Sequence, residues 1–442
     1  MKVAFYTLGC KVNQYETNLM MDEFKSNNYE IVDFKDIADV YVINSCSVTN
    51  LSTRKSRQAI SKARKLNNNS IVILVGCYTE ELKFTNSKFK LYDLALGNED
   101  KKEIIKYLNK YIEEKNKVEE NKIEKNDSKL VVKDDINKVK RYIQKDSVKT
   151  MNEIRQAIKI EDGCNNFCSY CIIPYTRGRV RSRNLNDILL EINNLVKKGI
   201  KEVVLVGIEI VSYGIDLDSN INLIEVIEQI NKIEGLQRIR LGSLEPRWLT
   251  DEVILRLKNI SKLCNHFHIS TQSLNNNILK RMNRKYTKEY IVNLVSKLKE
   301  NFNDVAITTD LIVGYINETD EEFLDTYNTV KEIGFSDIHV FKFSKREHTK
   351  AYNEDTTVTS SDLNKRSKYL IKLGYDLKIK YLKNMINKKY KILIEEYKDG
   401  YVYGYTSNYI KVKVKGDRNL WGKIIEVEIV EVEEDLVLAI LI

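Results

Sequence analysis

The sequence predicts an α/β protein of three parts: a small parallel α/β domain, a central partial (β/α) barrel and a small all-β barrel at the C-terminus. Three observations predict this fold class. Strand-like and amphipathic helical segments alternate over residues 1–100, which is typical of a parallel sheet. Strand-like and helical segments alternate again, over a longer stretch, in residues 151–375. From Lys391 the hydrophobic period changes to two, which indicates short half-buried strands.

The N-terminal part, residues 1–118, is expected to contain three strands and three helices. The predicted strands are Lys2–Leu8, Val40–Asn44 and Ile71–Gly76, and the predicted helices are Gln14–Ser26, Arg54–Leu66 and Ile104–Val118. Residues 119–150 are rich in charged residues and Asn but poor in aromatic residues, which predicts a solvated, mobile connector.

The central part, residues 151–375, reads as strand–helix units that begin at a cysteine-containing loop, as in a partial (β/α) barrel. Its predicted strands are Val203–Gly207, Arg238–Gly242, His266–Ser270, Ala306–Val313 and Ile338–Phe343. After a long basic helix, residues 376–442 hold short strands separated by Asp399-Gly400 and Gly416, which predicts the small all-β barrel.

Composition narrows the class of protein. Seven cysteines, an odd number in a large chain, predict a reducing, cytoplasmic location and metal binding rather than disulfides. No apolar run approaches the ~18 residues of a membrane helix, and the strand-like start predicts no signal peptide. The net charge of +9 fits a polyanionic partner, but 63 acidic residues offset most of the positive charge, so this evidence is weak.

A loop in the central part carries Cys164, Cys168 and Cys171 with the spacing C-x3-C-x2-C. Three thiolates can hold three irons of a cubane cluster and leave the fourth iron open to an exogenous ligand. Structural zinc, the alternative, takes four ligands, and no fourth Cys or His lies nearby in the sequence. The spacing, with Tyr170 before the last cysteine, is typical of radical S-adenosylmethionine enzymes.

A second set of cysteines follows the three predicted strands of the N-terminal part. Cys10, Cys46 and Cys77 each come at or just after a strand end. Ligands of open α/β sheets gather at the carboxyl ends of the strands, so these cysteines are expected to converge on one site. Three ordinary buried cysteines are the alternative.

These motifs resemble the tRNA methylthiotransferase family, and the resemblance covers nearly the whole chain. Gly9-Cys10-Lys11-Val12-Asn13 is similar to the branch that acts on N6-threonylcarbamoyladenosine beside the tRNA anticodon (position 37). The isopentenyladenosine branch usually has Gly-Cys-Gln-Met-Asn there, and the branch that modifies a ribosomal protein aspartate has Gly-Cys-Pro-Lys-Asn. Ile172–Gly178 and Ser243-Leu244-Glu245-Pro246 match the favoured branch as well.

The resemblance implies the roles of the cysteines. Cys164, Cys168 and Cys171 would hold a [4Fe-4S] cluster that binds and cleaves S-adenosylmethionine. Cys10, Cys46 and Cys77 would hold a second [4Fe-4S] cluster that carries the sulfur, which another S-adenosylmethionine methylates. The methylthio group would replace the C2 hydrogen of the adenine. The resemblance also implies a tRNA-binding TRAM domain over 376–442 and a reductant such as flavodoxin or ferredoxin; we expect a monomer without membrane contact.

Other candidates are polar residues near the predicted barrel mouth. Glu209, Glu245 and Gln272 lie at predicted strand ends and are expected to bind polar groups of the cofactor, or else to serve as surface or supporting residues. A further candidate is a set of four alternating arginines: Arg177, Arg179, Arg181 and Arg183. If their segment is extended, they share one face where substrate phosphates or a carboxylate could dock. The alternative is a stripe of arginines that only contact solvent.

Aromatic and imidazole residues give weaker signals. Tyrosines interleaved with lysines after Tyr397 suit base stacking and phosphate contact, or a barrel with half-buried tyrosines and solvated lysines. His266 and His268 alternate on a predicted strand, and metal binding by them is not expected. Cys264 has no spaced partner and is interpreted as structural.

The sequence departs from the family at loops of the predicted barrel mouth. Leu274 follows Gln-Ser where a glycine is usual, and Gly314-Tyr315-Ile316-Asn317-Glu318 replaces Gly-Phe-Pro-Gly-Glu. These loops are expected to be reshaped. The alternative functions are methylthiolation of isopentenyladenosine or of a ribosomal protein aspartate and, outside the class, a non-catalytic iron–sulfur RNA-binding protein.

Overall fold

The chain forms two compact units. The structure is a computed structural model that describes all residues except 86–88, 90, 122–128, 132–134, 144–153 and 220. One unit comprises Met1–Thr150, Glu161–Arg183 and Ser344–Tyr352, and the other comprises Met151–Ile160, Asn184–Phe343 and Asn353–Ile442. The loop with Cys164 therefore belongs to the same unit as the N-terminal sheet, whereas the sequence divides them at residue 150.

The first unit is built on a parallel sheet of strand order β2-β1-β3-β4-β5-β6. The strands are β1 (Lys2–Thr7), β2 (Glu30–Val32), β3 (Val40–Ser45), β4 (Ile71–Gly76), β5 (Leu94–Leu96) and β6 (Lys129–Val131). Because successive side chains of a strand point to opposite faces, continuous apolar runs such as Ile71–Gly76 serve a sheet that is covered on both faces.

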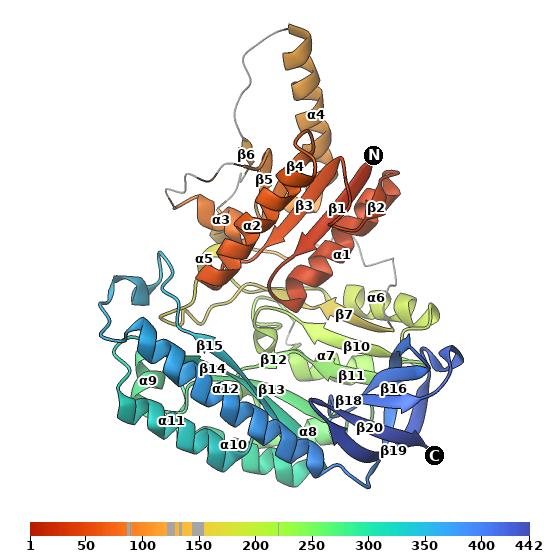
Figure 1. Cartoon of the computed structure of the whole chain (residues 1–442), viewed down its shortest axis with the longest axis vertical. Coiled ribbons are helices and arrows are strands. Elements are labelled where there is room, and N and C mark those ends of the chain that lie inside the picture. The colour runs from red at the N-terminus through yellow and green to blue at the C-terminus, as the bar shows by residue number, and fades with distance from the viewer. Residues whose placement is uncertain (86–88, 90, 122–128, 132–134, 144–153, 220) are drawn as a thin grey trace. The chain divides into compact units, whose positions relative to one another are not determined.

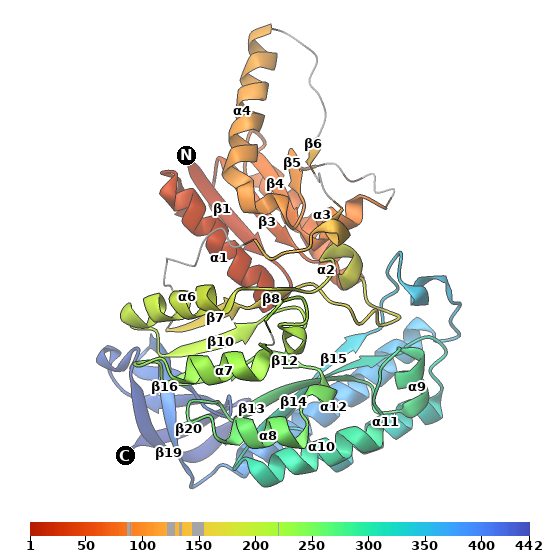
Figure 2. The ribbon, with the colours of Figure 1, turned by 180° about the vertical axis from the view of Figure 1, so that it is seen from behind.

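Helices cover both faces of this sheet. Helix α2 (Asn50–Leu66) covers one face (Figure 1). Its Ile60 belongs to the same buried apolar cluster as Ile43 of β3. Helices α1 (Lys11–Ser26) and α4 (Ile104–Asn121) cover the other face, where Phe24 meets Phe5 with ring centroids 5.5 Å apart (Figure 2). A short helix, α3 (Cys77–Leu82), follows β4 directly.

The prediction of a connector over 119–150 is wrong where the chain is regular: α4 extends to Asn121, and Ile136–Lys138 forms a short 3-10 helix. Residues 129–131 form strand β6, which pairs with β5 in parallel register. The sequence Lys129-Leu130-Val131 contains one strand-favouring residue, Val131, within a charged segment, and this run is too short to give a periodic signal. Much of the predicted connector lies outside the described residues.

The second unit contains the predicted partial (β/α) barrel. Its parallel strands form two groups of order β11-β10-β7 and β12-β13-β14-β15. They are β7 (Arg155–Lys159), β10 (Glu202–Val206), β11 (Arg238–Leu241), β12 (Ser243–Leu244), β13 (His266–Gln272), β14 (Ala306–Val313) and β15 (Asp337–Lys342). The helices between and after them are α6 (Leu185–Lys197), α7 (Leu223–Asn231), α8 (Asp251–Lys258), α9 (Asn276–Arg281), α10 (Lys288–Asn301), α11 (Asp320–Ile333) and α12 (Ser360–Lys383).

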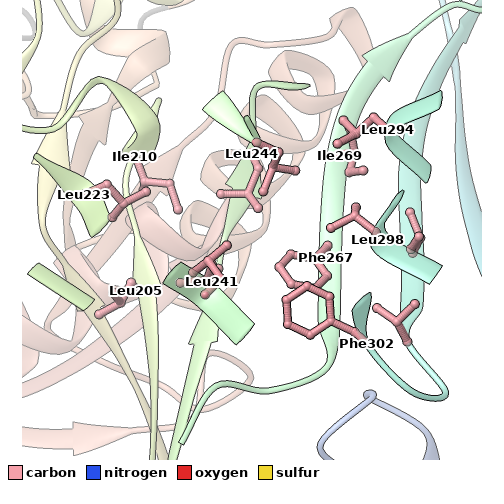
Figure 3. Close-up of a cluster of buried hydrophobic side chains, with 14 of the residues drawn as sticks. Leu205, Ile210, Leu223, Leu241, Leu244, Phe267, Ile269, Leu294, Leu298 and Phe302 are labelled. Carbon is pink, nitrogen blue, oxygen red and sulfur yellow. The ribbon is translucent and has the colours of Figure 1, made fainter. Parts of the chain in front are cut away.

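One face of β13–β15 packs against helices through a large apolar core. Phe267 and Ile269 of β13 face Leu298 and Phe302 from the α10 region, and the Phe267 and Phe302 ring centroids are 4.9 Å apart (Figure 3). Residues at alternate positions of these strands, such as His268, therefore lie on the opposite face.

The chain ends in a closed five-stranded barrel of order β16-β17-β18-β20-β19. Its strands are β16 (Lys389–Lys398), β17 (Tyr401–Thr406), β18 (Lys411–Lys415), β19 (Ile424–Glu433) and β20 (Leu436–Leu441). Buried Arg240 of β11 donates to Glu202 at 2.7 Å and to the backbone oxygen of Ser407 at 2.9 Å. The parallel α/β sheet, the strand–helix barrel and this terminal barrel confirm the predicted fold class.

The structure describes residues at both departures from the family loops. Asn317 has φ = 53°, a left-handed conformation that Asn tolerates better than other non-glycine residues. Leu274 is buried in the apolar core of the second unit. Among the described residues, no helix is long and apolar enough to cross a membrane.

Candidate functional site

Three neighbouring strands of the first unit bring Cys10, Cys46 and Cys77 to one edge of the sheet. The strands β1, β3 and β4 lie side by side, and Ser45 pairs with Gly76 at their carboxyl ends. Cys46 and Cys77 come directly after β3 and β4, and Cys10 caps α1 after β1. Burial and the nearby thiols of Cys77 and Cys10 raise the pKa of Cys46 to about 11.

Two residues of the Gly-Cys-Lys-Val-Asn motif fix the backbone around these thiols. Buried Asn13 donates from Nδ2 to the oxygen of Leu8 at 2.7 Å and to the oxygen of Ser45 at 2.9 Å. Gly9 has φ = 97°, and a Cβ atom on it would lie 2.9 Å from Cβ and 3.0 Å from Sγ of Cys46. Asn13 thus ties the loops of Cys10 and Cys46 together, and Gly9 lets them approach.

Gly9→Ala should destabilise the protein more than Gly400→Ala. Gly400 also has positive φ (80°) but nothing within 4 Å of its would-be Cβ, so this control carries only backbone strain of about 1 kcal/mol. Gly9→Ala adds the contact with Cys46, and we expect a loss of about 2–3 kcal/mol in the free energy of unfolding. Urea unfolding of the metal-free variants measures both losses, and equal losses would contradict the close approach.

The guanidinium of Arg177 connects this edge to the segment that follows the second cysteine set. Its Nε donates to Sγ of Cys77 at 3.3 Å, and its Nη1 and Nη2 donate to the carboxylate of Glu16 at 2.7 and 3.0 Å. Asp162 lies 3.3 Å away, and Asn13 Oδ1 accepts at 2.5 Å. Arg177 is fully buried; desolvation opposes its charge, but Glu16, Cys77 and Asp162 outweigh it and raise its pKa.

Arg177→Met should strongly destabilise the first unit. The substitution removes one buried cation from Glu16 and Asp162, which keep Lys101 at 2.6 Å and Arg181 at 3.6 Å respectively. We therefore expect a loss near the lower end of the about 3–5 kcal/mol that is typical of a broken buried ion pair. Arg179→Met is the matched control, because exposed Arg179 stacks only on the Phe167 ring at 4.3 Å; its loss should stay within about 0.5 kcal/mol. Urea unfolding distinguishes them, and a mild effect of Arg177→Met would contradict a structural role for the network.

The second cysteine set lies on a loop closed by two short antiparallel strands. Strand β8 (Glu161–Asp162) pairs with β9 (Arg181–Ser182), and the amide of Cys164 donates to the oxygen of Gly178 at 3.1 Å. Cys164 is buried, whereas Cys168 and Cys171 are half-buried. The short helix α5 (Ile173–Thr176) begins with Pro174 in its first turn and leads to Arg177.

The four alternating arginines do not share one exposed face. The segment is not extended throughout, because α5 ends at its start, and three of the four arginines are buried. Arg181 donates to the oxygen of Arg177 at 2.9 Å, and Arg183 lies 3.4 Å from the hydroxyl of Tyr15. Arg179 alone of these four is exposed, so a substrate-binding role stays a prediction that fits Arg179 best.

The three predicted cofactor residues lie at strand ends of the second unit. Glu209 follows β10, and Glu245 follows β12 with its carboxylate accepting from the backbone and side chain of Arg247, both at 2.9 Å. Gln272 ends β13 after a register shift and has φ = 65°. Their positions agree with the sequence analysis, and their cofactor role stays a prediction.

The tyrosines of the terminal barrel divide into two groups. Tyr405 and Tyr409 stack at 4.9 Å beneath the guanidinium of Arg155 and serve internal packing. Tyr401 is exposed, and Lys413 lies 4.9 Å from the centre of its ring. Tyr405 and Tyr409 thus fit the interpretation of half-buried packing tyrosines, and nucleic-acid stacking stays a prediction for exposed residues such as Tyr401.

Sequence reasoning missed the buried polar partners of the cysteine edge. Asn13 and Glu16 are three residues apart on α1 and so lie on one face of the helix. Lys101 donates to Glu16 at 2.6 Å and to Asn98 at 2.8 Å. The spacing of polar residues on one helix face directly after Cys10 could have indicated Asn13 and Glu16 as partners of the cysteines. Nothing in the sequence points to Lys101.

Comparisons with known proteins agree with this architecture. A model of the radical SAM superfamily matches residues 158–330, and one described as uncharacterized protein family UPF0004 matches residues 2–97. Among solved structures, the radical S-adenosylmethionine methyltransferase TsrM from Kitasatospora setae has a TM-score of 0.53 at 14% identity, covering 77% of this chain and 74% of that chain. Together with the parallel strand–helix barrel, these matches define a radical S-adenosylmethionine protein.

Curated relatives extend along nearly the whole chain. Threonylcarbamoyladenosine tRNA methylthiotransferase MtaB of Bacillus subtilis is 39% identical, covering 97% of this chain and 94% of that protein. The protein of the same name from Aquifex aeolicus is 37% identical, covering 97% and 100%. A tRNA-2-methylthio-N(6)-dimethylallyladenosine synthase of Thermoanaerobacter sp. is 33% identical, covering 96% and 89%. The chain belongs to the tRNA methylthiotransferase family.

Proposed function

We propose that the protein replaces the C2 hydrogen of N6-threonylcarbamoyladenosine in tRNA with a methylthio group. The motif Lys11-Val12-Asn13 after Cys10 supports this branch, as do the names of relatives with 39% and 37% identity. Relatives named for dimethylallyladenosine have identities of 30–34%, which makes isopentenyladenosine the second candidate substrate.

The observation that carries the proposal is that both cysteine sets belong to one compact unit. Cys10, Cys46 and Cys77 follow adjacent strands, and Cys164, Cys168 and Cys171 lie on a loop closed by β8 and β9. Thiolates are the ligands that iron–sulfur clusters take, so each set suits one [4Fe-4S] cluster with an open iron. When bound, these clusters would supply radical formation from S-adenosylmethionine and the sulfur to be inserted.

The residues around the first set fit a negatively charged cluster. Thiolate ligation requires deprotonation of Cys46, whose pKa is raised to about 11 by burial and neighbouring thiols, so binding of iron must displace its proton. Arg177 donates to Cys77 Sγ and can offset thiolate charge at that ligand. Asn13 and Gly9 hold the loops of Cys10 and Cys46 close together, so the protein positions these two cysteines without iron.

Other parts of the chain have assigned roles in the proposal. Glu209, Glu245 and Gln272 would bind the polar groups of S-adenosylmethionine from the strand ends of the central barrel. The exposed Tyr401 and the adjacent Lys413 of the terminal barrel suit stacking and phosphate contact with tRNA. We propose a cytoplasmic monomer that receives electrons from a flavodoxin or ferredoxin.

Nucleoside analysis of tRNA from a strain lacking the gene tests the substrate. We expect the 2-methylthio derivative of N6-threonylcarbamoyladenosine to disappear while the parent nucleoside accumulates, and a plasmid copy of the gene to reverse both changes. A copy with Cys164→Ala should not reverse them. Loss of the methylthio group from isopentenyladenosine instead would reassign the protein to the other tRNA branch.

A further inference from the structure

Three adjacent strands of the second unit present two histidines and an aspartate on one face. His268 lies on β13, Asp310 on β14 and His339 on β15. Asp310 pairs with His339 in register, and His268 pairs with Thr308, two residues before Asp310. All of them therefore lie on the same side of the sheet, opposite the face where Phe267 and Ile269 pack against α10 (Figure 3).

The side chains of these three residues converge at short distances. His268 Nε2 lies 3.2 Å from Asp310 Oδ2, and His339 Nδ1 lies 3.1 Å from Asp310 Oδ1. One potential ligand atom from each residue lies within 4.8 Å of the other two. The imidazole rings are stacked with centroids 5.5 Å apart. Ligand atoms around a metal at ~2.1 Å are typically about 3.0–3.4 Å apart, so the two imidazole–carboxylate spacings are like those of a metal site.

Thr308 orients the more buried of the two histidines. Its Oγ1 lies 2.8 Å from Nδ1 of His268, which directs Nε2 toward Asp310. Histidine ligands of metals commonly have their second ring nitrogen fixed by such a partner. Exposure increases across the strands, with side-chain exposures of 13% for His268, 25% for Asp310 and 57% for His339. Solvent can therefore reach the three donor groups.

We propose that His268, Asp310 and His339 bind a divalent first-row transition metal ion. Two imidazole nitrogens and one carboxylate oxygen form a donor set that favours Fe²⁺ or Zn²⁺ and also accommodates Mn²⁺, whereas Ca²⁺ and Mg²⁺ prefer oxygen ligands alone. Three protein ligands on a solvent-reachable face leave coordination positions for water or an oxygen ligand. The site uses no cysteine, so it is separate from both cysteine sets, and it does not rest on the proposed function.

The same geometry also fits a hydrogen-bonded network without a metal. Burial disfavours ionisation of Asp310, but hydrogen bonds from His268 and His339 outweigh it and lower the pKa of this carboxyl. The hydrogen bond with Asp310 raises the pKa of His339, and a proton on this imidazole would then take the place of a cation. The two arrangements differ in a measurable way, because only the metal site binds one ion per chain.

Titration with Mn²⁺ tests the site. The full-length protein is freed of metals by chelation and desalting, and the EPR signal of free Mn²⁺ is followed; thiols compete little, because Mn²⁺ prefers oxygen and nitrogen ligands. We expect one Mn²⁺ per chain, with Asp310→Asn and His339→Asn binding at least ~10-fold more weakly. His339→Asn is the safer variant for folding, since its side chain is 57% exposed.

Two further variants make the test specific. Thr308→Val keeps all three ligands but removes the hydroxyl beside His268, and it should weaken binding about 10–100-fold. His348→Asn removes a histidine that lies in the first unit, against the Phe84 ring, and should bind Mn²⁺ as the unmodified protein does. Absence of Mn²⁺ binding by the unmodified protein, or equal binding by His339→Asn, would overturn the proposal.

Discussion

Replacing Cys164, Cys168 and Cys171 together with alanine should abolish reductive cleavage of S-adenosylmethionine. The reconstituted protein should bind about eight irons, from two cubane clusters, and the variant should retain about four. The open iron of the cluster on this loop is the proposed attachment point of the cofactor that is cleaved, so loss of this cluster removes the proposed site of radical formation. Iron analysis and the yield of 5′-deoxyadenosine measure the two effects.

Cys264→Ala is the control for this experiment. Cys264 is a buried cysteine of the second unit, and burial raises its pKa to about 12, as expected for a structural thiol. Its replacement should leave both the iron content and the cleavage unchanged. Cofactor cleavage by the triple variant at the rate of the unmodified protein would contradict the role assigned to the loop.

Replacing Cys10, Cys46 and Cys77 together with alanine should separate the two proposed functions of the clusters. The variant should still cleave S-adenosylmethionine, because the loop of Cys164 is unchanged, but it should form no methylthio product. About four irons should remain. Parallel assays of 5′-deoxyadenosine and of the modified nucleoside measure the separation.

This second variant should remain folded, because most of the hydrogen bonds around Arg177 are kept. Arg177 loses the Sγ of Cys77 as an acceptor but keeps Glu16 and Asp162, so the buried guanidinium stays paired. We therefore expect the variant to unfold far less readily than Arg177→Met does. Formation of the methylthio product by this variant would contradict a sulfur-carrying role for the first cysteine set.

Much of the fold could be predicted because its strands are long and apolar. The predicted spans Ile71–Gly76 and Ala306–Val313 are those of β4 and β14. The three-residue strands β2 and β5 were missed, since three residues are too few to establish a hydrophobic period. Strand β6 was missed for the same reason, within a segment whose composition favours a connector.

The positions of the cysteines could be predicted from their spacing in the sequence. Contacts between residues that are far apart in the chain could not. The cysteines follow strand ends, and strand ends can be read from the sequence. Arg177 was expected to meet substrate, yet it pairs with Glu16, which is 161 residues away in the chain. Metal binding by His268 was not expected from the sequence, because only the sheet register brings Asp310 and His339 of two other strands beside it.

The most direct test of the proposed function uses the purified, reconstituted protein with two tRNA substrates. One tRNA carries N6-threonylcarbamoyladenosine and the other carries isopentenyladenosine, and each is incubated with S-adenosylmethionine, reductant and a sulfur source before nucleoside mass analysis. We predict that the threonylcarbamoyl nucleoside gains the mass of a methylthio group in place of hydrogen, whereas the isopentenyl nucleoside is unchanged. Methylthiolation of isopentenyladenosine alone, or of neither nucleoside, would contradict the account.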